Sequence, residues 1–221
     1  MLMQVFYEII VSPRKAFERL AEKPRWWQGF AVVIPLIILG NLIRIWGGYE
    51  FLVQAAAERL SQLPPEQAEA AERWMTLPAM LGTTAINKLI IIPIAVLIQA
   101  TLFHLMVPLS GGEANYGKTF GLVIWSKMVI ALGSWTTGVL TLAIGQPFRT
   151  DMGVFVDLNS KLQGGLSQIE IFSIWSLALV AEGMVRVIGC KRLASYLVVF
   201  GLWAVWVAIS FGIGAFLGGA G

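Results

Sequence analysis

Two charged side chains, Glu182 and Arg186, stand four residues apart in an otherwise apolar stretch of the chain. A helix would place both on one face, where they can form an ion pair. An ionisable group at the centre of a bilayer costs about 2.5–3.5 kcal/mol, so the presence of this pair indicates a functional role or mutual neutralisation. It indicates a proton or ion pathway, a polar contact with another helix, or a self-neutralised salt bridge near the inner interface. We favour the salt bridge, with Arg186 extending towards the inner surface.

Other polar residues also interrupt apolar stretches: Asn41, Arg44, Asn87, Lys88, His104 and Lys127. The first four form two pairs at similar depth, so we expect them to meet across helices and help set the packing of a bundle. Lys127 is expected to extend towards the inner surface. His104 is the only histidine, and no Cys or carboxylate cluster accompanies it, so it predicts no metal site.

The sequence contains no nucleophile elbow and no HExxH, GxGxxG or Walker motif, so it predicts no enzyme. Small residues at helical spacing near the C-terminus predict close helix packing, more often within a chain than between chains: Gly212, Gly214, Ala215, Gly218 and Gly219. Trp203 and Trp206 lie in the same stretch, and we expect each indole to have a hydrogen-bond partner. Cys190 is interpreted as a small apolar residue at a helix end, although Lys191 and Arg192 beside it would lower its pKa or favour its acylation.

The elements that carry these residues are predicted to be membrane helices. Of the 221 residues, 57% are hydrophobic and 13% are charged, whereas an average soluble domain has about 25% charged residues. This composition excludes a soluble enzyme, a disordered chain and a disulfide-stapled secreted domain. No basic stripe with interleaved aromatic residues occurs, so nucleic-acid binding is not expected. The predicted fold class is all-α, a polytopic membrane helical bundle.

A hydrocarbon core of about 30 Å requires roughly 20 apolar residues in a helix. Five stretches meet this length within a membrane domain at 27–218, and they predict five transmembrane helices at about 27–49, 86–108, 120–144, 169–188 and 193–217. The leader 1–26 is predicted to contain a cytoplasmic amphipathic helix at the interface, with Ser12 as an N-cap before Pro13. The outer segment 50–76 predicts two short helices separated at Leu63–Pro65, and 145–168 predicts an outer loop.

Basic residues predict the orientation. With the N-terminus inside, the inner segments carry eight Lys and Arg, and the outer segments carry four. Cytoplasmic loops are enriched in such residues. We therefore expect a multi-pass protein of the bacterial inner membrane, with a cytoplasmic N-terminus and, after five spans, an external C-terminus.

Several sequence motifs resemble the bacterial branch of the Yip (Ypt-interacting-protein-like) membrane family. They are the leader phrase Ser12–Leu20 followed by Pro24-Arg25-Trp26, Gly111-Gly112-Glu113 with Tyr116–Phe120, Glu170–Leu179 with Gly183, and Lys191–Ala194. The likeness covers nearly the whole chain. The family pattern has a Tyr-Ala-Ser-x-Pro-like phrase in the third span, where this chain has Ile124–Met128 without the proline.

The resemblance implies a polytopic, non-enzymatic protein that brings no catalytic residues and no cofactor. Eukaryotic relatives of this kind resemble trafficking factors for small GTPases, and bacterial ones resemble accessory subunits, sometimes beside ABC-type exporters. Our leading hypothesis is an accessory or scaffold subunit whose partners are the lipid bilayer and other integral membrane proteins, such as an ABC-type transporter or a larger complex. The alternatives are a small transporter or channel using Glu182 and Arg186, and a structural subunit of an energy-converting complex that holds pigment or quinone.

Overall fold

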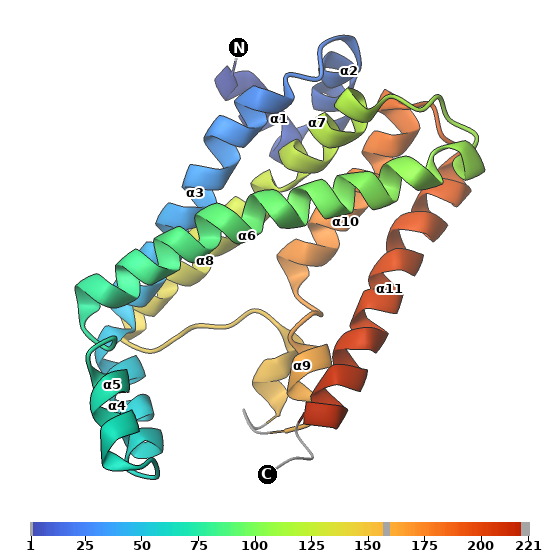
Figure 1. Ribbon diagram of the computed structural model, residues 1–221. Helices are drawn as coiled ribbons and strands as arrows, with labels where there is room; N and C mark the ends of the chain where they lie inside the picture. Colours follow the sequence, from blue (N-terminus) through green and yellow to red (C-terminus); the bar gives the residue numbers. More distant parts are fainter. Residues whose placement is uncertain (1, 157–159, 218–221) are drawn as a thin grey trace. The chain divides into compact units, whose positions relative to one another are not determined.

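The regular elements of the protein are all helices, as expected from the sequence (Figure 1). The computed structural model describes residues 2–156 and 160–217. The helices are α1 (Leu2–Val11), α2 (Pro13–Glu22), α3 (Trp26–Gly47), α4 (Tyr49–Leu60), α5 (Pro65–Glu72), α6 (Leu77–Met106), η1 (Pro108–Ser110), α7 (Tyr116–Ser126), α8 (Met128–Ile144), η2 (Met152–Phe155), α9 (Gln163–Leu166), α10 (Ile171–Val187) and α11 (Arg192–Leu217). Within the described ranges the only β-type contact is an isolated bridge between Asp151 and Glu170.

Four segments of the described chain are long and apolar enough to cross a membrane: Trp26–Gly47, Leu77–Met106, Tyr116–Ile144 and Arg192–Ile213. They contain four of the five predicted spans. The remaining span, predicted at 169–188, forms α10, which has 17 residues and carries Glu182 and Arg186. Because α10 has 17 residues, fewer than any of these four segments, the predicted number of five spans is not confirmed.

The chain divides into two compact units. The first unit comprises Met1–Val33, Ile94–Ile130 and Thr150–Gly221, and the second comprises Ile34–Pro93 and Ala131–Arg149. Helices α3, α6 and α8 each contribute residues to both.

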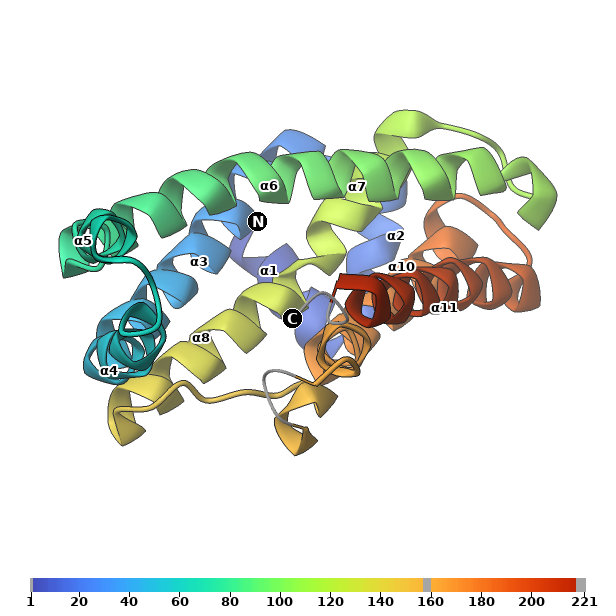
Figure 2. The ribbon, with the colours of Figure 1, turned by 60° about the horizontal axis from the view of Figure 1, so that its bottom comes forward.

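Helix α10 is central to the packing of the first unit, where it contacts α2, α7 and α11. Figures 1 and 2 both show α10 and α11 side by side. Leu122, Val180 and Met184 are fully buried, and Gly183 lets α10 approach the side chains of Leu122 and Phe17 closely. This apolar contact, which removes side chains from both water and lipid, forms the core of the unit.

The leader forms two helices instead of the single amphipathic helix that we predicted. The break falls at Ser12 and Pro13, where the proline starts α2 and the Ser12 side chain makes no capping hydrogen bond. The residue before a proline disfavours helical geometry, which explains the break. Phe17 and Leu20 are buried as expected, but α2 packs on α10 and α7, so its apolar side faces protein.

Close contact between the 34–47 part of α3 and the 131–144 part of α8 characterises the second unit. A β-carbon added at Gly40 would lie 2.7 Å from the Ser134 carbonyl carbon, and one added at Gly138 would lie 2.5 Å from the Gly40 oxygen. The Trp135 indole donates a hydrogen bond to the Leu36 carbonyl at 3.0 Å. The absence of side chains at these glycines therefore allows the two backbones to touch.

The outer segment of the second unit matches its prediction. Helices α4 and α5 are separated by residues 61–64, and α5 begins at Pro65. Both views show α4 and α5 side by side (Figures 1 and 2). Tyr49 donates a hydrogen bond to the Met75 carbonyl at 3.1 Å, which joins the start of α4 to the chain just beyond α5. Paired prolines break a helix wherever they occur, so this boundary was readable from the sequence.

The third predicted span is interrupted at Lys127. Helix α7 ends at Ser126, and α8 starts at Met128, whereas the sequence predicted one helix over 120–144. The Ser176 hydroxyl of α10 donates to the Ser126 carbonyl at 3.1 Å. A bond from another helix thus satisfies a backbone oxygen beside the interruption, as a break inside a bilayer requires.

Candidate functional site

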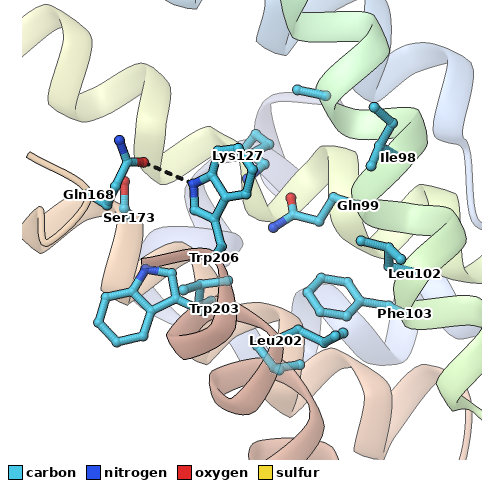
Figure 3. Close-up of a pocket in the computed structure, with 13 residues that line it drawn as sticks. Ile98, Gln99, Leu102, Phe103, Lys127, Gln168, Ser173, Leu202, Trp203 and Trp206 are labelled. Atoms are coloured by element: carbon cyan, nitrogen blue, oxygen red, sulfur yellow. Dashed lines mark hydrogen bonds between the residues drawn. The ribbon is translucent and has the colours of Figure 1, made fainter. Parts of the chain in front are cut away.

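A cavity of about 510 Å³ lies within the first unit (Figure 3). Its volume falls in the range of about 300–1,000 Å³ that is usual for small-molecule sites. Nine of its thirteen lining residues are apolar or aromatic, and they come mainly from the 94–106 part of α6 and from α11. The four polar lining residues are Gln99, Lys127, Gln168 and Ser173. The cavity is therefore a mainly apolar chamber with a small polar group of side chains.

One wall of the cavity is fixed by a hydrogen bond. The Trp206 indole of α11 donates to the Gln168 side-chain oxygen at 3.1 Å (Figure 3). Gln168 directly follows α9, which packs against α11. The prediction that Trp206 has a partner is confirmed, whereas Trp203 has no hydrogen bond within the described part of the chain and packs edge-on against Phe200.

Lys127 brings the only formal charge to the cavity lining. Among the residues that the structure describes, none forms an ion pair or hydrogen bond with its ammonium group. We expected Lys127 to extend towards the inner surface. Instead it lines the cavity with Gln168 and Ser173, which stand at the start of α10.

Sequence reasoning missed Gln99, Gln168 and Ser173. They come from segments up to 74 residues apart, and only the fold brings them together. Of these three residues, only Gln99 had a recognisable sequence signal, because its amide lies within the apolar run LIQAT. A polar residue inside a predicted span marks a candidate pathway or binding site.

The Glu182 and Arg186 pair lies near the other end of α10. Arg186 donates from Nε to Glu182, and Arg192 Nη2 lies 3.2 Å from the second carboxylate oxygen of Glu182. The predicted salt bridge is confirmed, and Arg192 adds a partner that the sequence analysis had not identified. Glu182 and Arg186 neutralise each other, and Arg192 adds a second positive charge beside the same carboxylate.

Comparison with known proteins fits this architecture of apolar helices. The model of the Yip1 domain matches residues 7–214. The chain belongs to the Yip1 domain family. A curated relative, "Membrane protein YknW" of Bacillus subtilis (strain 168), is 28% identical over 209 residues, which cover 92% of this chain and 87% of YknW. No solved structure matches the chain. The resemblance drawn from the sequence motifs is thus confirmed, and the protein is a Yip1-family membrane protein.

The polar pairs of this Yip1-family protein that were predicted to meet across helices lie in its second unit. Asn41 donates to the Ser134 hydroxyl of α8 at 3.3 Å and to the Ile37 carbonyl at 2.8 Å. Arg44 and Lys88 are close enough for their like charges to interact, while Asn87 is exposed. Asn41 therefore does join two helices, but its partner is a serine that we had not singled out.

His104 packs within the Yip1 domain without a metal-binding neighbourhood. Its Nδ1 lies 3.4 Å from the Thr119 hydroxyl, and its ring meets Tyr116 edge-on at 5.3 Å between centroids. No group of three or more metal-ligating side chains occurs among the residues that were described. His104 thus connects α6 to α7 within the first unit.

The small residues of α11 fall partly outside the described residues of the Yip1 domain. Gly218 and Gly219 lie beyond them, and for Gly214 and Ala215 only the helical backbone is described. Gly212 is exposed, and a β-carbon added there would meet nothing within 4 Å. At Gly212, packing against another part of the chain is therefore not observed.

Cys190 joins α10 to α11 and is 3% exposed. Burial raises the pKa of its thiol, and a hydrogen bond with Ser195 opposes this rise only in part. The alternative in which Lys191 and Arg192 lower this pKa is contradicted, since desolvation of the buried thiolate outweighs these exposed charges. The interpretation of Cys190 as a small buried residue at a helix end agrees with the structure.

Proposed function

We propose that this protein is a non-enzymatic accessory subunit that docks through α11 onto another integral membrane protein. The observation that supports the proposal is a face of α11 that is built from small residues and is exposed in the described part of the chain. An ABC-type transporter or a larger membrane complex is the partner class that the family resemblance suggests first.

The α11 face consists of Gly201, Ala204, Ala208 and Gly212, which recur every three or four residues and are all exposed. A β-carbon added at Gly201 would meet no atom within 4 Å, as at Gly212. Val199, by contrast, is fully buried and lines the cavity. At about 100° per residue, the α11 face lies on the side of the helix opposite Val199.

Small residues on a membrane helix favour contact with another helix. Lipid tails are as apolar as leucine, so burial of apolar surface does not drive helices together within a bilayer. Close approach of the two backbones does drive helices together, and it requires small residues at the contact. A helix surface that faces only lipid needs no small residues. A protein partner is therefore the best explanation for the α11 face.

We also propose that five helices cross the membrane, with the N-terminus in the cytoplasm and the C-terminus outside. The 17 residues of α10 extend about 26 Å, close to the hydrocarbon thickness of about 30 Å. The neighbours α2, α7 and α11 cover much of α10, which accounts for its tolerance of Glu182 and Arg186. The excess of basic residues on the inner segments supports the orientation.

Purification from native membranes in a mild detergent tests the docking proposal. We expect a second integral membrane protein to co-purify with the wild-type chain and to be lost with Ala208→Leu and Gly201→Leu, as measured by quantitative mass spectrometry. The matched control is Gly82→Leu, because Gly82 lies on α6 and also faces open space. That variant should retain the partner, and all three variants should be about as stable as the wild type, or slightly more stable where leucine replaces glycine, because leucine favours a helix more than glycine does. The proposal is wrong if the wild-type protein purifies alone or if the α11 variants retain the partner at the wild-type level.

A further inference from the structure

The cavity of the first unit combines three features that together define a class of ligand. It is lined mainly by apolar side chains, it lies among helices that are mostly long and apolar enough to cross a membrane, and it contains a cation that has no counter-charge among the described residues. This inference does not depend on the proposed docking of α11, since the cavity and the α11 face lie on different sides of that helix.

Lys127 lies deep within its span. Eleven residues separate it from the start of α7 at Tyr116, which corresponds to about 16 Å of helix and to about half of a hydrocarbon core of about 30 Å. Lysines at such depth usually pair with a carboxylate or with backbone carbonyls. Lys127 pairs with neither in the described part of the protein, so its counter-charge is expected to come from outside the chain.

Amide groups surround the cation. The Gln99 amide points into the cavity (Figure 3) and makes no hydrogen bond with any described residue. The Gln168 side-chain oxygen is engaged by Trp206, which leaves its NH₂ group, 3.4 Å from the Gly164 carbonyl, only weakly bound. Amide NH₂ groups beside an ammonium group provide hydrogen-bond donors for an anion.

The apolar walls of the cavity indicate which chemical group the ligand carries besides its anion. Leu102 and Phe103 of α6 face Leu202 and Trp203 of α11 across the cavity (Figure 3). Helix α11 contacts η1, which follows α6 after one residue, and from there the 94–106 part of α6 and α11 diverge in Figure 1. A chamber between diverging membrane helices accepts a hydrocarbon chain, whereas a small inorganic anion would leave these walls without a contact.

We propose that the cavity binds an amphiphile with one anionic head group, a carboxylate or a phosphate, whose charge is neutralised by Lys127. The Gln99 amide donates to the head group, and the hydrocarbon chain lies between α6 and α11. Trp203 and Trp206 close the wall on the side of α11. Binding neutralises a charge that is otherwise unpaired near the middle of the membrane.

Photolabelling of the full-length protein tests this site. The protein is placed in nanodiscs of neutral phosphatidylcholine and exposed to a 16-carbon fatty acid that carries a diazirine on its chain. After illumination, mass spectrometry measures the yield of labelled peptides from residues 94–106 and 192–213. We expect Lys127→Gln to reduce this yield about tenfold, since a charged hydrogen bond is worth about 1.5–3 kcal/mol. Lys127→Arg should retain most of it.

Two controls separate charge at the site from charge in general. Lys118→Gln removes a lysine from α7, the helix that ends directly before Lys127, without touching the cavity, and it should label like the wild type. The methyl ester of the same fatty acid has no charge and should label the wild-type protein as weakly as the acid labels Lys127→Gln. The ester comparison needs no variant, so it decides the question even if Lys127→Gln does not fold.

Competition distinguishes the sources of the anion. Excess unlabelled oleate that displaces the probe supports a fatty-acid ligand, and excess phosphatidylglycerol that displaces it supports a lipid phosphate, both within the proposal. Displacement by millimolar inorganic phosphate alone would show a site for a free anion and would overturn it. Equal labelling by the acid and its methyl ester, or equal labelling of the wild type and a folded Lys127→Gln, would overturn it as well.

Discussion

Small residues serve opposite purposes in two regions of this protein. In the second unit, Gly40 and Gly138 bring α3 and α8 into backbone contact, so that an added β-carbon would overlap the neighbouring helix. In the first unit, Gly201 and Gly212 of α11 face open space. Helices α3 and α8 of the second unit and helix α11 of the first unit all carry glycines within long apolar runs. The glycine pattern therefore marks a surface suited to close packing, and only the fold shows whether the chain itself occupies that surface.

The two regions also differ in their polar contacts. Beside the α3–α8 contact, Trp135 and Asn41 each make a hydrogen bond to the other helix. The described residues of the α11 face are Gly201, Ala204, Ala208 and Gly212, whose side chains contain no hydrogen-bonding group. An occupied contact thus combines close approach with specific bonds, while the open face offers close approach alone.

The largest expected difference between the regions comes from adding one methyl group. Gly138→Ala should destabilise the protein by about 2–3 kcal/mol or prevent folding, because the new carbon would overlap the Gly40 backbone oxygen and overpacking usually costs about 1–3 kcal/mol. Gly201→Ala should instead stabilise it by about 0.5–1 kcal/mol through the better helix propensity of alanine. Thermal unfolding in detergent, followed by tryptophan fluorescence, measures both. A Gly138→Ala protein as stable as the wild type would contradict the close α3–α8 contact.

Removal of an indole hydrogen bond should have a smaller effect. Trp135→Phe loses the bond to the Leu36 carbonyl, and we expect a loss of about 1 kcal/mol in unfolding free energy. Trp206→Phe also loses an indole bond, to Gln168, but Trp206 is 54% exposed, so we expect a loss of less than about 0.5 kcal/mol. Denaturant titration of the two variants provides the comparison. If Trp206→Phe proved the more damaging, the larger contribution expected from the bond at the α3–α8 contact would be contradicted.

The Asn41–Ser134 bond should contribute least among the interhelical contacts. A double-mutant cycle with Asn41→Ala, Ser134→Ala and the double variant is expected to give a coupling of about 0.6 kcal/mol, the average for such bonds in membrane proteins. Unfolding free energies of the four proteins measure it. A coupling of zero would mean that close packing alone holds α3 against α8.

A third glycine contact can be examined without any substitution. A β-carbon at Gly112 would lie 2.5 Å from the Cys190 sulfur, so this thiol is tightly covered. Because burial raises its pKa, the neutral thiol should persist above pH 8.5, near the usual value for cysteine. Alkylation by iodoacetamide should be slower than for a free cysteine at pH 7.5. Its rate should still rise with pH where that of the free thiol has levelled off, and a rate that levels off at lower pH would contradict the burial.

The sequence predicted the features that depend on local signals. The prolines at 64 and 65 separated α4 from α5, and the spacing of Glu182 and Arg186 indicated their ion pair. The sequence did not predict features that need distant segments to meet. Arg192 joins Glu182 only after the turn between α10 and α11 is made, and Gln99, Gln168 and Ser173 converge only in the folded unit.

The break at Lys127 escaped prediction for a different reason. No proline or glycine marks it, and the run from Phe120 to Ile144 reads as one continuous apolar helix. The bond from Ser176 to the Ser126 carbonyl accompanies the break, and this partner lies 50 residues further along the chain. A signal placed so far away cannot be recognised from local propensity.

The bond between Ser176 and Ser126 has a consequence for the biogenesis of the protein. During synthesis the segment that carries Lys127 leaves the ribosome before the segment that carries Ser176. Until α10 arrives, the Ser126 carbonyl beside the break has no hydroxyl to satisfy it. Helix α10, with 17 residues, is in turn shorter than the four segments that are long and apolar enough to cross a membrane. The segment that carries Lys127 and helix α10 thus depend on each other in the membrane. A nascent chain that ends before α10 is expected to remain associated with the insertion machinery.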